Sequence, residues 1–364
     1  MKCKLIIAVV CLLTCASAIN AQVFEKSKSE TRSFPATKGC TVNISNKYGS
    51  IQVIPNDVDS VKFIVEVKVT NKKEEDADQN LDAVSANFTS NPYLITASTV
   101  FRNAPSQWKT DLNDLAKYVF NPTNKVEINY FVYLPPTVNL KIDNKYGNVF
   151  VADHSGQVNI SLSNGDLKAG NINNDASFRF SFVNASVASV ANLTADMNYS
   201  ELTLKKANNA RITSKSSKYW ITSISKIEMD SKSDKFSIDT IANVSGKTSF
   251  TGFNADVLTE GILLTSLYGD FNIGEVLPSV KFLNLNTEYT DVVLIFKNDV
   301  SCNLFADYRK TKITYTPGIG ELVTTVTDEE KQQSTTSGKI GAAENPASSV
   351  QIYAISGSIT LLKR

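Results

Sequence analysis

Apolar and polar side chains alternate along most of this chain, and the phase of the alternation changes at intervals. In segment 44–53 the apolar positions are even-numbered up to Tyr48 and odd-numbered from Ile51 onward. Alternation with a period of two predicts a β-strand. A change of phase by one residue requires a bend or bulge if both halves face one core. Gly49 lies at this bend, where we expect a residue without a Cβ to adopt an unusual backbone conformation.

The same phrase recurs along the chain. Segment 142–151 repeats segment 44–53 almost residue for residue, and looser copies span 197–204, 264–273 and 285–294. The residues that mark the repeated corners are Tyr48, Gly49, Tyr146, Gly147, Gly165, Tyr199, Tyr268, Gly269, Tyr289 and Gly357. From 147 onward the corners are expected at 147, 165, 185, 200, 219, 236, 253, 269 and 290, a mean step of about 18 residues.

A repeat of this length predicts the architecture. At about 3.3 Å per residue, a coil of about 18 residues has a perimeter of roughly 60 Å, which is enough for three short faces. One such coil cannot bury its apolar side alone, so neighbouring coils must stack. The repeat therefore predicts an all-β fold of the β-solenoid (β-helix) type, with solenoid repeats over residues 141–321.

Residues 22–140 read as an N-terminal β-rich segment that contains the first repeat. Strict alternation predicts strands at 61–69, 93–100 and 126–134. Asn71, followed by three acidic residues, predicts a capped helix near 73–86. A second amphipathic stretch at 106–119 predicts another short helix, which we expect to face the core rather than a partner.

The C-terminal residues 322–364 break the pattern. Residues 327–347 are polar and predict a long surface loop. Residues 350–361 recover the alternation around Gly357, so we expect a final strand that caps the solenoid. Lys363 and Arg364 would keep the edge of this strand from pairing with other chains.

Residues 1–21 predict a secretory signal peptide, with two lysines, an apolar run at 5–13 and small residues before the cleavage point. A lipoprotein signal ending at Cys15 is the alternative, but Thr14 fits it poorly. No later run is long enough to span a bilayer. We therefore expect an exported protein of the periplasm or cell surface.

Charge and cysteine content narrow the possibilities further. Loss of Lys2 and Lys4 with the signal would turn the formal net charge of +1 into −1. No basic segment stands out, which argues against nucleic acid as a partner. Cys40 and Cys302 would lie at opposite ends of a stack of coils, too far apart for a disulfide. Both are expected to be buried free thiols.

The chain offers little catalytic or metal-binding chemistry. His154 is the single histidine, and its neighbours Asp153 and Ser155 would point to the opposite face of a strand, so we expect a solvated turn rather than a catalytic group. Asp143, Asp166 and Asp270 lie beside corners, where carboxylates usually accept turn hydrogen bonds. The sequence contains no zinc or calcium motif and predicts no catalytic residue, metal or cofactor.

The corner tyrosines allow two interpretations. Their phase matches that of Ile44 and Ile142, which places them in the core. If they faced outward instead, they would form an aromatic strip suited to sugar rings or to a partner chain. We expect the core position, with Asn46 and Asn144 forming an internal amide ladder beside the tyrosines.

The order of these elements resembles a known family. A strand, an acidic capped helix and a further strand lead into residues 130–140 and then the Tyr146-Gly147 corner, as in the bacterial putative-adhesin family, a β-helical cell-envelope domain of unknown function. The resemblance covers residues 30–364 and implies a right-handed parallel β-solenoid in an exported envelope protein. It brings no catalytic residues. The chain departs from the family between 170 and 255, where Trp220, Phe236 and Phe253 stand in place of the Tyr-Gly corner.

Two classes of function follow. The first is a non-catalytic exported cell-envelope protein that acts as an adhesin, scaffold or glycan-contact module, with a cell-surface glycan or an envelope protein as its partner. The alternative is a carbohydrate-active β-helix enzyme similar to polysaccharide lyases or glycoside hydrolases. The architecture alone supports the alternative, because carboxylates on adjacent coils lie at a spacing that hydrolysis can use.

Overall fold

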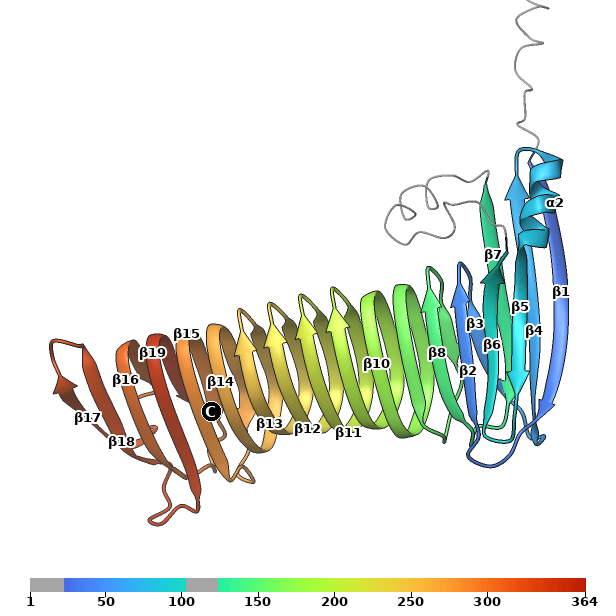
Figure 1. Ribbon diagram of the computed structural model, residues 1–364. Coiled ribbons are helices and arrows are strands. Elements are labelled where there is room, and N and C mark those ends of the chain that lie inside the picture. The colour runs from blue at the N-terminus through green and yellow to red at the C-terminus, as the bar shows by residue number, and fades with distance from the viewer. Residues whose placement is uncertain (1–22, 103–123) are drawn as a thin grey trace, which may run out of the picture.

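The structure is a computed structural model, and it describes residues 23–102 and 124–364. In this part of the chain, nineteen strands belong to a single sheet, and one helix lies at its N-terminal end (Figure 1). The predicted signal peptide and the predicted helix at 106–119 fall outside the described residues, so both stay predictions. The elements in chain order are β1 (Phe24–Pro35), β2 (Thr41–Lys47), β3 (Ile51–Pro55), β4 (Ser60–Asn71), α2 (Glu74–Ala83), β5 (Val84–Ser90), β6 (Leu94–Phe101), β7 (Lys125–Leu134), β8 (Asn139–Lys145), β9 (Val149–Val151), β10 (Val158–Asn198), β11 (Glu201–Lys215), β12 (Lys218–Lys232), β13 (Lys235–Ser249), β14 (Gly252–Val276), β15 (Phe282–Phe296), β16 (Cys302–Tyr315), β17 (Gly320–Asp328), β18 (Gln333–Ile340) and β19 (Ser348–Lys363).

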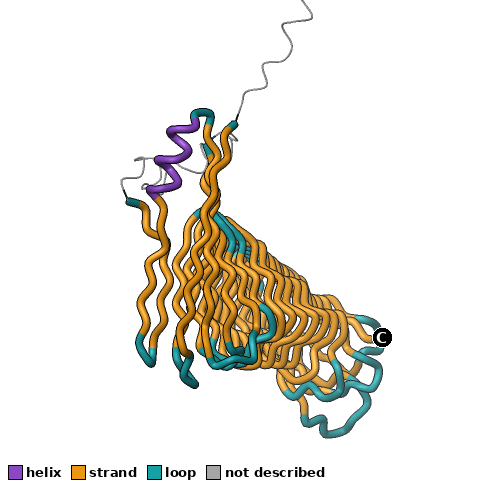
Figure 2. Tube along the Cα trace, turned by 90° about the vertical axis from the view of Figure 1, so that its right-hand side faces the viewer, coloured by secondary structure: helices purple, strands orange, loops and turns teal. Residues whose placement is uncertain are grey.

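The chain winds in stacked turns through the middle of the molecule. Leu167 pairs in parallel with Val149, 18 residues before it, and Leu202 pairs in parallel with Tyr219, 17 residues after it. The same spacing joins β10 through β13, so each turn takes 17 or 18 residues, close to the predicted step. Figure 2 shows the strands of successive turns lying one behind another.

The space inside the turns is filled by apolar side chains that form one continuous cluster from Cys40 to Leu361. Aromatic rings from neighbouring turns stack within it: the centroids of Tyr219 and Phe236 lie 4.4 Å apart, and those of Phe253 and Phe271 lie 4.9 Å apart. Tyr219, Phe236 and Phe253 were expected at corners and are instead fully buried.

Four of the corners between 170 and 255 lie elsewhere than predicted, whereas the corner predicted at 200 is confirmed by the positive φ of Tyr199. The residues with positive φ at the four other corners are Phe182, Ser216, Ser233 and Phe250. The turns begin at 183, 217, 234 and 251, two residues before the predicted corners at 185, 219, 236 and 253. Three of the predicted corners carry aromatic residues, Tyr219, Phe236 and Phe253, and these misled the prediction. Their rings occupy the core two residues after the positions at which the turns begin.

The insert between the first two repeats covers the N-terminal end of the stack. Strands β2 and β3 form the first turn and pair in parallel with β8 and β9 of the next turn. On their other side they pair with β6 and β7 of the insert. Strands β7, β4 and β1 continue the sheet in antiparallel order, and α2 packs against β1 and β4 (Figure 1).

The insert follows the predicted elements closely, with two differences. The strands at 61–69, 93–100 and 126–134 are present as β4, β6 and β7. Helix α2 ends at Ala83, earlier than expected, because Val84 begins β5, which pairs antiparallel with β6. Asn71 does not cap the helix; its side-chain oxygen accepts a hydrogen bond from the Lys73 amide at 3.2 Å, and Lys73 takes the N-cap position.

The C-terminal end corrects two expectations. Strand β19 is not a cap, because it lies between β15 and β16 and pairs in parallel with both. The predicted polar loop at 327–347 contains β18, which pairs antiparallel with β16 and with β17. This hairpin is rich in threonine, a β-branched residue that favours strands although it is polar. The hairpin, rather than the last strand, ends the stack.

Two predictions about the chain as a whole can be compared with the described residues. Cys40 and Cys302 are free and buried, as predicted, and burial raises the pKa of the Cys302 thiol to about 12. Among the residues that the structure describes, no helix is long and apolar enough to cross a membrane.

Candidate functional site: an aromatic row at one corner of the coil

Every turn of the stack contains one corner residue in the left-handed backbone region. These residues pair turn by turn and so form one line along the molecule, which we call the outer row. The residue that follows each of them points into the turn, and we call this second line the inner row. The outer row consists of Tyr48, Tyr146, Asn164, Phe182, Tyr199, Ser216, Ser233, Phe250, Tyr268, Tyr289, Ser356 and Lys310, with φ between 48° and 65°.

The unusual conformation lies on the outer row and not, as predicted, on most of the corner glycines. Tyr146 has a φ of 58°, whereas Gly147 lies outside the left-handed region. Glycine is needed at Gly147 because a Cβ there would lie 1.9 Å from the backbone oxygen of Gly49 in the turn below. Gly165 lies in the same way over Gly147. Gly357 is an exception, because it has a φ of 94°.

The inner row changes from glycine to hydrogen-bonding residues in the middle of the stack. Asp234 is 1% exposed, and its carboxylate accepts hydrogen bonds from the Ser217 amide at 2.7 Å and the Ser231 hydroxyl at 2.6 Å. Ser214 and the Lys232 amide donate two more. Ser200 accepts in the same way from the Val183 amide. The side chains of Ser200 and Asp234 therefore each accept a hydrogen bond from the backbone of the previous turn. The corner forms there without glycine.

Rings on the outer row stack in two exposed groups. Phe182 and Tyr199 form the first stack, with centroids 5.2 Å apart and planes at 6°. Phe250, Tyr268 and Tyr289 form the second, with centroids 4.9 and 4.7 Å apart. Their exposed fractions range from 41% for Tyr268 to 58% for Phe182. The expectation that Tyr199, Tyr268 and Tyr289 lie in the core was wrong.

The reason for the error lies at the corner itself. Two consecutive residues point outward there, such as Asn198 and Tyr199, before the alternation resumes with Ser200 inside. The phase therefore changes before the tyrosine rather than after it. Tyr48 is the exception, being 2% exposed, because the insert covers it: its ring contacts that of Phe101 at 6.2 Å and stacks on Tyr146 at 5.5 Å.

The asparagines beside the first corners are buried as expected, but they do not form a ladder with one another. Asn46 donates to the backbone oxygen of Ile128 at 2.9 Å, and Asn144 donates to that of Gly49 at 3.0 Å. Both amides therefore support the corner backbone of the preceding layer.

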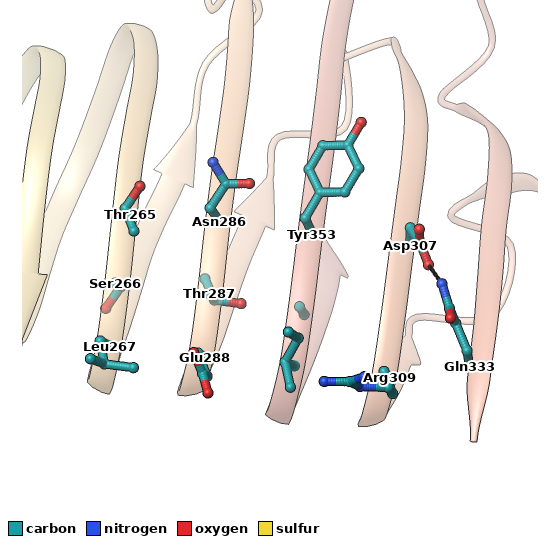
Figure 3. Close-up of a pocket in the computed structure, with 12 residues that line it drawn as sticks. Thr265, Ser266, Leu267, Asn286, Thr287, Glu288, Asp307, Arg309, Gln333 and Tyr353 are labelled. Carbon is teal, nitrogen blue, oxygen red and sulfur yellow. Dashed lines mark hydrogen bonds between the residues drawn. The ribbon is translucent and has the colours of Figure 1, made fainter. Parts of the chain in front are cut away.

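A groove adjoins the C-terminal end of the outer row (Figure 3). It has a volume of about 490 Å³ and crosses strands β14, β15, β19, β16 and β18. Tyr353 is 47% exposed beside it, and Asp307 accepts a hydrogen bond from Gln333 at 2.9 Å. Glu288 and Arg309 also line the groove. Each directly precedes an outer-row residue, Tyr289 and Lys310 respectively. The sequence did not reveal this groove, because it depends on β19 lying out of chain order between β15 and β16.

The residues considered for catalysis are not brought together. His154 is 2% exposed rather than solvated, and its Nε2 bonds the Val138 backbone oxygen at 2.8 Å. Burial lowers its pKa, so the ring is neutral. Asp166 and Asp270 each follow a corner glycine but lie six turns apart, on the order of 29 Å at about 4.8 Å per turn. Asp143 lies before a corner rather than after it.

The described residues also contain no group of three or more His, Cys, Asp or Glu side chains that could hold a metal ion. Some acidic side chains already accept hydrogen bonds from other groups of the protein. Asp153, for example, accepts from the amide and the side chain of Asn171, which lowers the pKa of its carboxyl. The surface along this edge presents flat rings, amides and charged side chains.

No family model and no curated protein matches the sequence. Several solved structures are similar. A putative adhesin from Bacteroides fragilis shows 10% identity over 93% of this chain and 97% of its own, with a TM-score of 0.31. A putative adhesin from Parabacteroides merdae shows 12% identity over 73% and 96%, with a TM-score of 0.33. A putative lipid binding protein from Parabacteroides distasonis shows 10% identity over 93% and 97%, with a TM-score of 0.28. The adhesin names agree with the resemblance found in the sequence.

Proposed function

We propose that this protein is a non-catalytic, exported cell-envelope module, wound as a right-handed β-solenoid, that binds glycan along its outer row. One observation carries the proposal: five rings lie half-exposed in two stacks on a single edge. A soluble protein rarely leaves a line of large apolar side chains in water unless something covers it. Aromatic rings with a polar tip suit ligands that are apolar on one face and hydroxylated at the rim, as sugars are.

The groove supports the same function. Its lining combines one exposed ring, Tyr353, with amide and charged groups from Asn286, Asp307 and Arg309. A few polar groups around an aromatic surface orient a ligand while the ring supplies contact area. Because Glu288 and Arg309 directly precede outer-row residues, the groove and the second stack of rings form one continuous surface. A chain-like ligand could contact both.

The alternative is a carbohydrate-active enzyme, and one observation favours it. Asp270 and Asp291 lie in register on adjacent turns, two residues after Tyr268 and Tyr289. Retaining glycosidases hold two carboxyl groups about 5 Å apart, which is close to the spacing of stacked strands. Asp291, however, already accepts a hydrogen bond from the Ser358 hydroxyl at 2.6 Å.

A glycan array combined with a reducing-end release assay separates the two functions. We expect the purified protein to bind a subset of glycans and to release no reducing ends from them. The variant Asp270→Asn/Asp291→Asn should bind as the wild type does. Release of reducing ends by the wild type, lost in this variant while its melting temperature is unchanged, would establish the enzyme instead. An array without any bound glycan would overturn the proposed function.

A further inference from the structure

The outer row contains a gap between its two stacks of rings. Ser216 and Ser233 occupy the two turns between Tyr199 and Phe250, and we call this pair the serine gap. It lies over β11, β12 and β13 in the middle of the elongated body (Figure 1). With about 4.8 Å per turn, the two bordering rings are roughly 14 Å apart along the row. Two consecutive turns between the two stacks therefore lack a ring.

The rings that border the gap present a face to it. Tyr268 has a stacked ring on each side and is 41% exposed, whereas Tyr199 and Phe250 have a ring on one side only and are 50% and 56% exposed. The rings within a stack are nearly parallel, at 6° to 7°. The uncovered faces of Tyr199 and Phe250 therefore look along the row toward the serine gap from its two ends.

Four lysines flank the serine gap. Lys215 and Lys232 immediately precede the two serines, and Lys218 and Lys235 follow two residues after them. All four are exposed. In the turns on either side the corresponding positions are Asn198 and Ser249 before the corner, and Glu201 and Gly252 after it. Between Tyr199 and Phe250, lysines therefore stand only in the two turns that lack a ring; Lys47 and Lys145 take the place before the corner at Tyr48 and Tyr146.

The fold gives no reason for this arrangement. Lys215 lies directly opposite Lys232, and Lys218 lies directly opposite Lys235, on neighbouring strands. Like charges directly opposite each other destabilise a sheet. Acidic groups also lie near the lysines: Glu201 pairs with Lys218 at 2.7 Å, Asp234 is buried beneath, held by serine hydroxyls and backbone amides, and Asp230 is exposed two residues before Lys232. Lys215, Lys232 and Lys235 keep their charge available at the surface.

We propose that the serine gap binds an acidic glycan, and this inference rests on the proposed glycan-binding function. One sugar unit at each end of the serine gap would stack on the face of Tyr199 or of Phe250. The carboxylates of the glycan would lie beside Lys215, Lys232 and Lys235. The small serines leave the room that a ring at either position would fill.

A nucleic acid also combines flat rings with negative charge, but the surface favours a glycan. Nucleic-acid binding relies on positive charge that follows the backbone over many phosphates. Here the lysines cover two turns, and the chain as a whole carries a formal net charge of only +1. Single-stranded DNA is therefore included below as a competing ligand.

The test compares ligands that differ only in charge. Polygalacturonate, alginate and hyaluronate are each titrated against the protein beside their carboxyl-reduced forms, with oligothymidylate as a further ligand. We expect at least one acidic form to bind about tenfold or more tightly than its reduced form, and less tightly in higher salt. Equal binding of acidic and reduced forms would overturn the inference and leave the proposed function standing. Tighter binding of oligothymidylate would overturn the inference in favour of nucleic acid.

If none of these polysaccharides binds, the inference fails, and the glycan array then decides separately whether the proposed function fails too.

Two matched pairs of variants locate the site. Lys215→Gln/Lys232→Gln/Lys235→Gln should weaken binding of the acidic form about tenfold. Lys205→Gln/Lys206→Gln/Lys226→Gln removes as many exposed charges from the same turns and should leave binding unchanged. Equal losses in both triple variants would contradict the proposed site.

The second pair of variants adds aromatic rings, first within the serine gap and then, as a control, outside it. Ser216→Phe/Ser233→Phe should abolish binding while the protein stays folded, because Phe182 and Phe250 adopt the same backbone conformation on this row. Ser225→Phe adds a ring at an exposed position of β12, nine residues from Ser216 and outside the outer row, and should bind as the wild type does. Unchanged binding by the filled variant at an unchanged melting temperature would overturn the proposal.

Discussion

The inner and outer rows meet at the same corner but follow different rules. The inner row accepts glycine where the turn below approaches closely, as at Gly147, a hydrogen-bonding side chain, as at Asp234, and the buried Val183. The outer row accepts Tyr, Phe, Asn, Ser and Lys at nearly the same φ. The backbone corner is therefore independent of which residue stands outside it. Stability is decided by the inner row, and the outer row is free to serve a ligand.

The largest effect is expected where the inner row has no space. Gly147→Ala should lower the free energy of unfolding by about 3 kcal/mol, because the added Cβ meets the backbone of Gly49 at 1.9 Å and cannot move aside. Gly252→Ala is the matched control, since a Cβ there has only the Asp270 carboxylate at 3.7 Å. Chemical denaturation measures both. Equal stabilities would mean that the glycine column is not required by packing.

The next largest effect is expected at the hydrogen-bonded part of the inner row. Asp234→Ala should cost about 2 kcal/mol, because it leaves the Ser217 amide and two serine hydroxyls without their acceptor in a buried place. Asp234→Ser should cost less, since Ser200 and Ser217 fill the same position in neighbouring turns. If the alanine and serine variants unfold at the same denaturant concentration, the side-chain bond to the previous turn contributes nothing.

A smaller effect is expected from acid, at a buried group away from the corner. Burial lowers the pKa of His154 below its unfolded value of about 6.5. Its contribution to stability is therefore fully present above pH 6.5 and is lost as the pH falls below that value, since the unfolded chain then binds the proton more readily. The melting temperature should drop between pH 7.5 and pH 5, and less so in His154→Gln. An identical drop in that variant would show that other groups are responsible.

The sequence predicted the repeat. It did not predict that each corner consists of an outer-row residue followed by an inner-row residue. The Tyr-Gly phrase at Tyr146 and Gly147 revealed a phase change of one residue, and the spacing of the turns follows from it. Where the inner row changes to Ser217 and Asp234, no glycine marks the corner, and the buried rings of Phe236 and Phe253 were taken for it. Hydrophobic alternation cannot distinguish a ring that fills the core from a ring that stands at a left-handed corner.

The C-terminal end of the stack was harder to predict for a different reason. Strand β19 pairs with β15 and β16 after the chain has passed through β17 and β18, and chain order gives no sign of this exchange. The groove beside Arg309 and Tyr353 depends on it. The helix and strands of the insert were predicted well because each carries its own local pattern, as Glu74 and the alternation around Val65 show.

The claim that the outer row serves binding rather than folding has a direct test. Tyr199→Ser/Phe250→Ser places on two corners the residue that Ser216 and Ser233 already carry there. Each change removes one stacked contact and should cost about 1 kcal/mol in the free energy of unfolding, less than either change in the inner row. We expect the glycan-array signals of the double variant to fall about tenfold or more while it remains folded. Array signals equal to those of the wild type, or loss of the folded state, would contradict the division between the two rows.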